Sequence, residues 1–517
     1  MFIDVLKENQ LKLINLYDLD ELSTTKYSGD RKYWGWKTID FENDTMIGGC
    51  LSIAISVRLG VCLYDKFYLQ LINGIFNSLS DKVISKSNGL EEAYPNENSF
   101  CVTSLVANDL LMTIYLLDGI LESNKKIKYL EILEPLIDFI HNNIESHGII
   151  SNHLATAASA IEIWNVLSNK ELPNPFIEKI IKYQSDEGWY LEYEGADPGY
   201  QTLTAHYLSM IHYVNPSVNL LNSVRKSFKY LIHFLGPNHS IGGLYGSRNT
   251  EIIYPGGINY FSKFSSEAAK IDKEISKGLK EKLLLQPHHI DIDNYIPLLN
   301  SFSWRAFLNF EYQSNLKDKF FNNFSFKQFD QSGIIIKRTK KYFAVINYKK
   351  GGAIRVFDIK KKTLIHENGG LIITFKGNQY TSQKFNRKIK FNNKSHEINF
   401  YKKQKNTIGK FSFIIVRILT FTLLRLKIFN DLFKKLVVSI LITRKQKQKF
   451  CGLLRYEFKD EKIEINFKPN FKMKGVDLSF EKRFTNIHMA SSKYFLPQHI
   501  DLYKSKNKIV KYLLDAT

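Results

Sequence analysis

The periodicity of apolar residues changes once along the 517-residue chain, near residue 320. Between residues 46 and 312, apolar residues recur at three- and four-residue spacing, which is typical of helices that bury one face. These helical segments are 48–63, 99–121, 129–144, 153–167, 202–214, 218–235 and 295–310, and Gly, Pro, Asn and Asp fill the gaps. Successive helices with loops of similar length predict an incomplete α/α toroid whose loops form a groove on one face.

After residue 320 the pattern becomes that of short strands. β-rich runs occur at 333–338, 342–348, 353–358, 370–375, 453–458 and 462–467, separated by Lys-rich or glycine turns. We expect an antiparallel β-sandwich here. The predicted fold is an α+β multidomain chain. It has an irregular N-terminal arm at 1–45, an α/α toroid at 46–315 and a β-sandwich at 316–517.

A strongly apolar stretch at 411–441 interrupts the β pattern. Six charged residues break it up: Arg417, Arg425, Lys427, Asp431, Lys434 and Lys435. No run of about 18 uncharged apolar residues remains, so we expect no spanning helix. A helical amphipathic insertion at about 405–450 fits better, and its basic flanks suit an anionic membrane surface. Packing on the sandwich or on another subunit is the alternative.

The net charge of +21 is unevenly placed. Residues 1–310 hold 27 Lys and Arg against 36 Asp and Glu, whereas residues 311–517 hold 45 against 15. Such asymmetry predicts two domains with different partners. The basic half carries no helix-turn-helix, RRM, KH or zinc signature, so we expect no nucleic-acid partner.

The cysteines, the glycine-rich segment and the N-terminal residues indicate which metal, disulfide and cofactor sites, and which cellular location, to expect. Cys50, Cys62, Cys101 and Cys451 form no CxxC pair, so neither a zinc ribbon nor a disulfide framework is expected. No GK[ST] follows the glycine-rich segment 242–257, which is therefore not a phosphate loop. We expect no cofactor and no metal. The charged start MFIDVLKENQ lacks the apolar segment of a signal peptide, which favours a cytoplasmic location, peripheral to the membrane if the insertion contacts it.

Two loops of the helical region concentrate polar and aromatic residues. Asp186–Gly199 holds three glycines and reads as a loop, since each Gly inside a helix costs about 1 kcal/mol relative to Ala. Ser151–His153 is the start of another helix. Because loops on a helical scaffold concentrate function, we expect Asn152, His153 and Tyr200 to form a site.

An Asn-His pair that opens a helix, followed by a D-x-G-W-x-x-E loop ending in Tyr, resembles the heparinase II/III-like family. The order of domains is similar too. Alginate lyases and uronyl epimerases of similar architecture belong to the same wider group. The resemblance covers most of the chain at the level of fold and is specific at Ser151–His153 and Asp186–Tyr200.

The resemblance implies an enzyme that acts on an acidic, uronate-containing polysaccharide by β-elimination. A base removes the C5 proton beside the carboxylate, and an acid protonates the leaving oxygen at C4. Asn152 matches the residue that neutralises the carboxylate, His153 matches the adjacent His that supports it or exchanges a proton, and Tyr200 matches the catalytic Tyr. The candidate substrate contacts are Glu92, Tyr94, Trp189, Glu192 and Arg248.

Each of these residues also has an ordinary structural role as its alternative. Ser151-Asn152 would cap a helix, His153 would be a first-turn histidine and Tyr200 a core aromatic. Glu192 and Asp197 would order the loop rather than bind substrate.

The chain departs from the family at the start of the sandwich, where family lyases usually carry a His-rich motif. His366 and His396 are the only histidines of the β region before His488, and His366 is a weak substitute. Two classes of function therefore stay open. One is a polysaccharide lyase or uronyl C5-epimerase. The other is a non-catalytic or atypical protein that binds a glycan or lipid-linked glycan at the cytoplasmic membrane face during polysaccharide biosynthesis.

Overall fold

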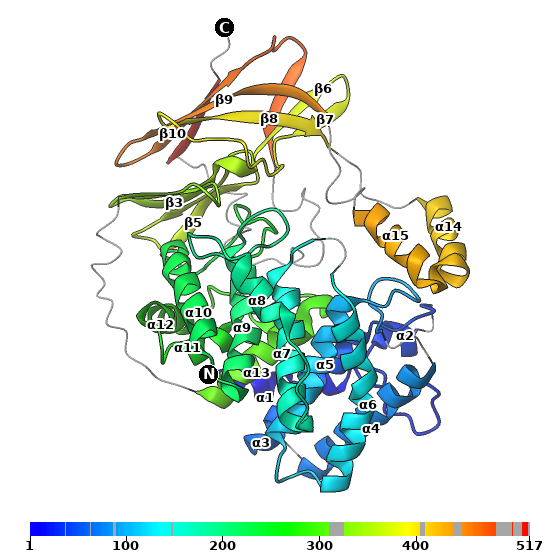
Figure 1. Ribbon diagram of the computed structural model, residues 1–517. Coiled ribbons are helices and arrows are strands. Elements are labelled where there is room, and N and C mark those ends of the chain that lie inside the picture. Colours follow the sequence, from blue (N-terminus) through cyan, green and yellow to red (C-terminus); the bar gives the residue numbers. More distant parts are fainter. Residues whose placement is uncertain are drawn as a thin grey trace.

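The computed structural model describes residues 1–36, 38–62, 64–85, 89–145, 148–309, 325–403, 409–438, 447–481, 499 and 509–514. A helical part comes first and a part made of two sheets follows, as Figure 1 shows. The expected domain boundary at 315/316 lies outside the described residues, and the division of the chain stays a prediction.

Within the described residues, six helices form an inner ring. They are α3 (Cys50–Arg58), α5 (Phe100–Leu116), α7 (Ser151–Ser168), α9 (Pro198–Val214), α11 (Pro255–Phe261) and α13 (Tyr295–Leu308). Each packs against the next, and their side chains are buried almost all round, as in helices at the centre of a domain. The predicted α/α toroid is confirmed. Its ring is closed rather than incomplete, because α13 returns to pack against α3.

A second set of helices lies outside the ring. It consists of α1 (Phe2–Ile14), α4 (Asp65–Ser85), α6 (Ser123–Asn142), α8 (Pro175–Lys182), α10 (Val218–Leu231) and α12 (Ser266–Lys280). Each packs against an inner neighbour, as α6 does against α5 and α7. In α6 the buried residues include Leu133, Leu136, Ile137 and Ile140, which is the spacing of a helix with one buried face.

The prediction of an irregular arm is wrong for residues 2–14, which form α1 and pack against α13. The physical reason is visible in the sequence, because the buried Phe2, Val5, Leu6 and Leu13 follow helical spacing. A short helix, α2 (Arg31–Trp34), follows in the arm.

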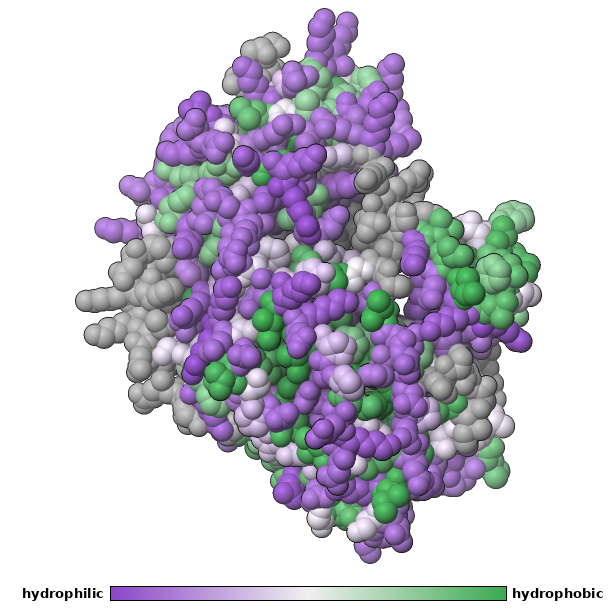
Figure 2. All heavy atoms as spheres, in the orientation of Figure 1, coloured by the Kyte–Doolittle hydropathy of each residue, from purple (hydrophilic) through white to green (hydrophobic). Residues whose placement is uncertain are grey.

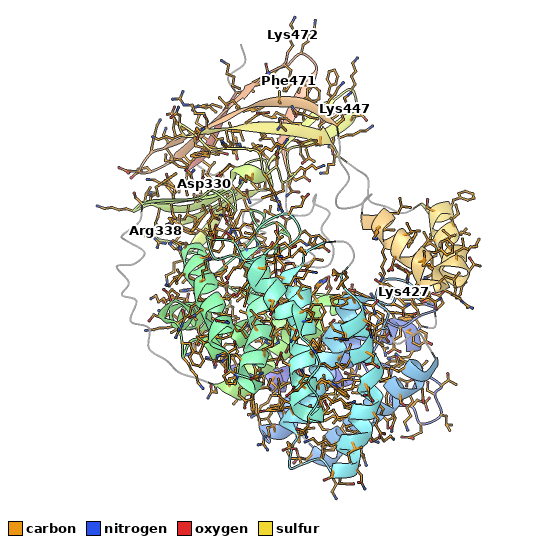
Figure 3. The ribbon with its side chains drawn as sticks, viewed as in Figure 1. Asp330, Arg338, Lys427, Lys447, Phe471 and Lys472 are labelled. Carbon is orange, nitrogen blue, oxygen red and sulfur yellow. The ribbon has the colours of Figure 1, made fainter. Side chains whose placement is uncertain are left out.

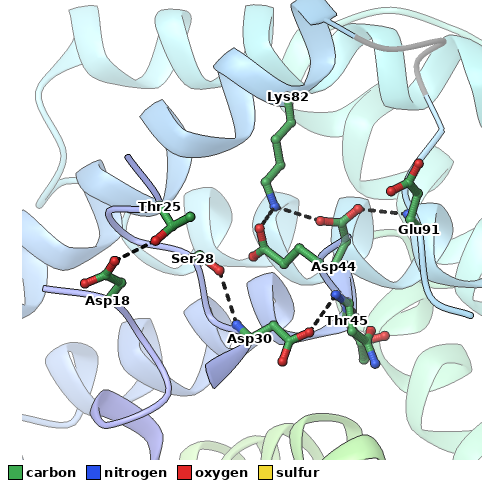
Figure 4. A network of polar contacts seen from close by, with 10 residues as sticks. Asp18, Thr25, Ser28, Asp30, Asp44, Thr45, Lys82 and Glu91 are labelled. Carbon is green, nitrogen blue, oxygen red and sulfur yellow. Dashed lines mark hydrogen bonds and ion pairs between the residues drawn. The ribbon is translucent and has the colours of Figure 1, made fainter. Parts of the chain in front are cut away.

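A buried ion network fastens the rest of the arm to the toroid, as Figure 4 shows. Lys82 of α4 pairs with Glu42 and, at 2.8 Å, with Asp44. The other oxygen of Asp44 accepts the backbone N–H of Glu91 at 2.8 Å. Because Glu42 and Asp44 are buried, the cation of Lys82 offsets a charge that would otherwise be costly. The network therefore fixes the start of the 91–98 loop.

The predicted β-sandwich is confirmed and consists of two sheets. The first contains, in order, β1 (Phe326–Phe329), β2 (Ile334–Arg338), β3 (Tyr342–Asn347), β4 (Ala353–Asp358) and β5 (Thr363–Asn368). The second has the order β11 (Val476–Phe480), β6 (Leu371–Phe375), β7 (Asn378–Thr381), β8 (Ser395–Lys402), β9 (Gln448–Phe458), β10 (Ile463–Pro469) and β12 (Val510–Leu514). Neighbouring strands are antiparallel, except that β12 runs parallel to β10.

The five-stranded sheet is buried on both faces, between the seven-stranded sheet and the toroid (Figure 1). Side chains alternate between the faces of a strand. In β3, Ala344 and Ile346 therefore pack toward the second sheet, while Phe343 and Val345 join the core of the toroid. This double burial explains why 342–347 reads as a continuous apolar run.

Buried cations of the β domain reach the toroid loop 242–251. Arg355 on β4 is fully buried, and its Nη1 donates to the carbonyl of Gly242 at 2.6 Å. Its guanidinium also pairs with Glu251, and its Nε lies 3.4 Å from the Oε1 of Glu367. Lys350 donates to the carbonyl of Leu244 at 3.0 Å. The loop is thus held by side chains from the other domain.

The insertion between β8 and β9 contains the expected helices, α14 (Lys410–Phe421) and α15 (Lys427–Val438), joined by a short 3₁₀ turn, η7 (Leu423–Arg425). In Figure 1 this pair lies beside the toroid. Residues 404–408 and 439–446, which include part of the predicted basic flanks, lie outside the described residues. Among the helices described, none has the length and apolar content to cross a bilayer.

Replacement of Arg355 tests how strongly the two domains depend on this contact. We expect Arg355→Met to lower the free energy of unfolding by about 3–5 kcal/mol, because it leaves buried Glu251 and Glu367 without their cation. Urea denaturation measures the change. Arg387→Met is the matched control. Arg387 is exposed, its contact with the toroid is one hydrogen bond at 3.3 Å to the carbonyl of Glu194, and its loss should cost about 1 kcal/mol or less. Equal stability of the two variants would contradict the expectation.

Candidate active site

The candidate site lies where α7 and α9 begin, at one pole of the toroid. The two helices are neighbours in the ring, and the loop between Ser185 and Asp197 contacts the first turn of each. Ser151 donates its backbone N–H to the carbonyl of Leu191 at 3.0 Å. Asp197 is the N-cap of α9 and accepts the N–H of Tyr200 at 3.1 Å. The loop expected from its glycines therefore positions both helix starts.

Glu192 is fully buried and caps α7 from outside that helix. Its carboxylate accepts the backbone N–H of Asn152 at 3.0 Å and the side-chain amide of Asn152 at 2.8 Å. The N-cap of α7 is Ile150, and no side chain caps the helix from that position. Neither Ser151 nor Asn152 is therefore the N-cap of α7. Glu192 orders the loop and the helix start through these hydrogen bonds, and its role as a substrate contact stays a prediction.

Burial governs the protonation of Glu192. Desolvation raises its pKa to about 8, and the charge of Asp197 raises it as well. The hydrogen bonds from Asn152 and the cation of Arg248 act in the opposite direction. Near neutral pH the acid is therefore largely protonated, and the amide of Asn152 faces a nearly neutral partner.

Asp197 joins three segments at this pole. Besides the N–H of Tyr200, its carboxylate accepts the backbone N–H groups of Arg248 at 2.7 Å and of Thr250 at 3.4 Å. Burial raises the pKa of Asp197, while these hydrogen bonds and the charge of Lys350 lower it. The carboxylate thus orders α9 and the 242–251 loop together, as the loop-ordering alternative predicts.

His153 has a carboxylate partner. Its Nδ1 lies 2.6 Å from the Oε2 of Glu145, and both side chains are largely buried. A carboxylate accepts only, so Nδ1 carries the proton of this hydrogen bond. Proton exchange with a ligand then takes place at Nε2 of His153. This is the arrangement of a histidine that is oriented for acid–base work.

Tyr193 links Arg248 and Tyr200. The guanidinium carbon of Arg248 lies 4.3 Å from the centre of the Tyr193 ring, within cation–π range. Burial raises the pKa of Tyr193, Arg248 lowers it, and Glu145 and Tyr200 raise it further. Tyr193 has a left-handed backbone with φ of 59°, which is uncommon for a non-glycine residue and accompanies functional sites. Tyr200 itself is partly buried.

Glu92 lies at the edge of this group and remains exposed to solvent. Desolvation by neighbouring groups and the carboxylates of Glu97, Asp293 and Glu145 raise its pKa, but contact with solvent limits the desolvation. Burial and the charges of Glu92 and Glu145 also raise the pKa of the Cys101 thiol well above its usual range. Cys101 is therefore a protonated thiol and not a nucleophile.

The structure brings together Asn152, His153, Glu192, Arg248 and Tyr200, with Glu92 nearby. Two other predicted substrate contacts have different surroundings. Trp189 is buried, and its Nε1 donates to Glu187 at 2.8 Å, where the loop meets the β domain. The hydroxyl of Tyr94 donates to Asn430 of α15 at 3.0 Å. Their roles as substrate contacts stay predictions.

Glu145 and Tyr193 were missed by the sequence analysis. Tyr193 lies inside the D-x-G-W-x-x-E loop and could have been included for that reason alone. Glu145 comes eight residues before His153 in an irregular segment, and no local pattern pairs the two.

His366 is held in a buried network of the β domain. Its Nε2 lies 2.8 Å from the side-chain amide of Asn368, which also donates to Tyr512 at 2.7 Å. Burial lowers the pKa of His366 to about 4, so the ring is neutral. Across the described ranges, no group of three or more His, Cys, Asp or Glu side chains is arranged to hold a metal ion.

The burial of Glu192 predicts a pH-dependent stability. Its carboxyl loses a proton near its ordinary pKa of 4.5 in the unfolded chain and near about 8 in the folded chain. The contribution of protonated Glu192 to the free energy of unfolding is therefore complete below about pH 4.5, and it is lost as the pH rises toward about 8. We expect Glu192→Gln to reduce this fall in the free energy of unfolding by up to about 1.4 kcal/mol per pH unit.

Urea denaturation at several pH values measures this slope. Glu131→Gln, on the exposed side of α6, controls for the loss of one carboxylate. A slope for Glu192→Gln equal to that of the unaltered protein would show that Glu192 does not titrate as described.

No family model matches the chain, and no curated protein matches it. Solved structures do match. A xanthan lyase from Paenibacillus is 10% identical, with a TM-score of 0.48, over 89% of this chain and 44% of that one. Heparinase III is 11% identical, with a TM-score of 0.45, over 78% of this chain and 68% of that one. A chondroitin AC lyase from Streptomyces coelicolor A3, in complex with chondroitin sulphate, is 9% identical, with a TM-score of 0.48, over 89% and 68%.

The chain therefore spans less than half of the xanthan lyase and about two thirds of the other two proteins. At these identities the likeness concerns the fold alone. This chain is similar in fold to the structures of heparinase III, a xanthan lyase and a chondroitin AC lyase.

Proposed function

We propose that this chain acts on an acidic, uronate-containing polysaccharide at the α7/α9 pole, by removal of the C5 proton and β-elimination. The observation that carries the proposal is the convergence of Asn152, the His153–Glu145 pair and Tyr200 at two adjacent helix starts. The names of the similar structures, which include xanthan lyase and chondroitin AC lyase, point to the same class of substrate.

Each group has a chemical task in this proposal. The amide of Asn152, assisted by the cation of Arg248, hydrogen-bonds the uronate carboxylate and stabilises the charge that develops when C5 loses its proton. Tyr200 or His153 takes that proton. The electron pair forms the C4=C5 double bond, the C4–O bond breaks, and the other residue of the two protonates the leaving oxygen. Glu145 and Glu192 position His153 and Asn152 without touching the sugar.

Residues 1–310 hold more acidic than basic residues, which by itself would disfavour the binding of a polyanionic substrate. Burial of acids at the pole reduces this effect. The pKa of Glu192 is raised to about 8, and burial raises the pKa of Asp197. These two acids at the pole are thus less ionised at neutral pH than isolated carboxylates would be. Arg248 remains charged beside them, so the local potential is more favourable to a polyanion than the excess of acids over bases indicates.

One observation favours the second candidate function, glycan binding without catalysis. One N–H of the Asn152 amide already donates to Glu192, and Tyr94 is engaged by α15 rather than open to a sugar. A site with these groups committed binds a glycan, or a lipid-linked glycan, without the transition-state contacts that a lyase needs. A uronyl C5-epimerase would use the same proton abstraction and return the proton to the opposite face.

Incubation with a panel of uronate polysaccharides separates these functions. We expect a rise in ultraviolet absorbance from the unsaturated product, and about a 100-fold or larger loss of rate in Tyr200→Phe, because the phenol exchanges a proton in the reaction. Tyr115→Phe on α5 is the matched control, since Tyr115 is also partly buried but packs against Tyr213.

Thermal denaturation of both variants shows whether a loss of rate reflects unfolding. Absence of unsaturated product on every substrate would contradict the lyase proposal. Deuterium incorporation from solvent at C5 would then indicate an epimerase. Saturable binding of an oligosaccharide without either change would indicate a glycan-binding protein.

A further inference from the structure

The helical pair α14–α15 exposes an unusual amount of apolar surface. Of the 26 large apolar side chains that are exposed among the described residues, twelve lie between residues 411 and 436. They are Phe411, Phe413, Ile414, Ile415, Ile418, Phe421, Leu423, Leu426, Ile428, Phe429, Leu432 and Leu436. In Figure 2 the surface over α14 and α15 is largely hydrophobic. Apolar patches of this kind mark interaction surfaces.

In this hairpin the side chains turned toward the protein are mostly polar and those turned outward are mostly apolar, which is the opposite of the usual pattern in water-soluble proteins. Its buried residues are Thr420, Leu424 and Asn430, two of which are polar. Phe411 and Ile428, by contrast, are 84% and 74% exposed. A hairpin stabilised by packing on its own domain buries its apolar side chains instead. The polar face of the hairpin therefore packs against the rest of the protein, and the apolar face points away from it.

Hydrogen bonds to the 94–98 loop of the toroid hold the polar face. The Nδ2 of Asn430 donates to the carbonyls of Asn96 and Glu97 at 2.8 and 2.9 Å. Asn96 in turn donates to the carbonyl of Thr420 at 3.0 Å, and Lys434 donates to the carbonyl of Asn98 at 3.0 Å. These contacts fix the orientation of the hairpin rather than leaving it free to turn.

A further anchor ties the hairpin to the N-terminal arm. Arg417 pairs with Asp40 at 2.8 Å, and its guanidinium carbon lies 5.3 Å from the ring centre of Phe41. On the other side, Phe433 packs edge-on against Tyr94, with ring centres 5.6 Å apart. The hairpin thus rests on two segments of the toroid.

The dimensions of the hairpin suit a bilayer surface and not a span. Each helix has 12 residues, which corresponds to about 18 Å at 1.5 Å per residue. The hydrocarbon core of a bilayer is about 30 Å thick. Two such helices, with apolar side chains on their outer faces, fit the interface between head groups and acyl chains.

The charge of the hairpin identifies the kind of surface. Residues 410–438 contain six basic residues and one acid, Asp431. Lys410, Arg425, Lys427 and Lys435 are exposed, and Figure 3 labels Lys427 at the start of α15. Their long side chains can keep the charge at the head-group level while the neighbouring Phe and Ile side chains enter the apolar layer. Cations beside exposed bulky apolar residues are complementary to anionic lipids.

We propose that α14–α15 is a docking device that inserts its apolar face into the surface of an anionic lipid bilayer. The proposal does not depend on the reaction at the α7/α9 pole. It does place that pole close to the membrane, because the hairpin rests on the loop that carries Glu92, as the hydrogen bond from Lys434 to the carbonyl of Asn98 shows.

Vesicle flotation of the full chain tests the proposal. We expect binding to vesicles of phosphatidylcholine with phosphatidylglycerol, and much weaker binding to phosphatidylcholine alone or at high salt. Phe411→Glu combined with Ile428→Glu should lower partitioning about tenfold or more, because it places carboxylates in the apolar layer. Arg425→Glu with Lys427→Glu and Lys435→Glu should lower it by a similar factor on the anionic vesicles.

Leu22→Glu with Val218→Glu is the matched control, since these residues are 94% and 73% exposed, similar to Phe411 and Ile428, but lie outside the hairpin. All substituted side chains are exposed, and circular dichroism verifies that each variant folds. Equal flotation of the hairpin variants and the unaltered chain would overturn the proposal. So would failure to bind any vesicle combined with self-association that Phe411→Glu with Ile428→Glu abolishes, since the occupant of the face would then be a second copy.

Discussion

The carboxylate of Asp197 is the joint on which the candidate site depends. It accepts N–H groups from the first turn of α9 and from two residues of the 242–251 loop, and so connects that helix start to that loop. A buried acid of this kind is tolerated only when donors and cations surround it. Lys350 supplies a positive charge from the β domain while it donates to the carbonyls of the same loop. The geometry of the candidate site in the toroid therefore depends on a residue of the sandwich.

Local sequence patterns predicted many of the helices and strands, but they did not predict the contacts between them. Helical spacing located five of the six inner helices, all except α11, and β-rich runs located six of the twelve strands, because each of these elements buries side chains with its own period. The pattern failed for α12, where Lys270 and Asp272 are buried at positions that a simple apolar count treats as exposed. The Lys270 ammonium is compensated by Glu274, and the carboxylate of Asp272 by Arg305. Only the folded chain shows these partners.

The candidate site shows the same limit. Asn152, His153 and Tyr200 were found from the motif, and so was the loop between the helices. Their partners were not, since the contact between Glu145 and His153 and that between Arg248 and Tyr193 join segments with no shared pattern. Glu192 was named as a substrate contact and as an ordering acid, and hydrogen bonds to Asn152 support the second role. A motif identifies which residue types occur at a given spacing. Which hydrogen-bond and ion-pair partners these residues have depends on how the folded chain buries them.

The uneven charge of the chain is consistent with the proposed docking of the hairpin on an anionic surface. The basic excess lies in the half that contains the sandwich and α14–α15, while the acids of the toroid that surround the pole are partly neutralised by burial. An anionic surface would therefore attract the protein by its β half and its hairpin and would not be repelled at the pole. The hairpin is the decisive element, because it turns Asn430 inward and Phe411 and Ile428 outward, and an apolar cover over its outer face would stabilise it further. The anchors at Asp40 and Asn96 hold the hairpin against the toroid, so docking as proposed would also set the orientation of the pole relative to the bilayer.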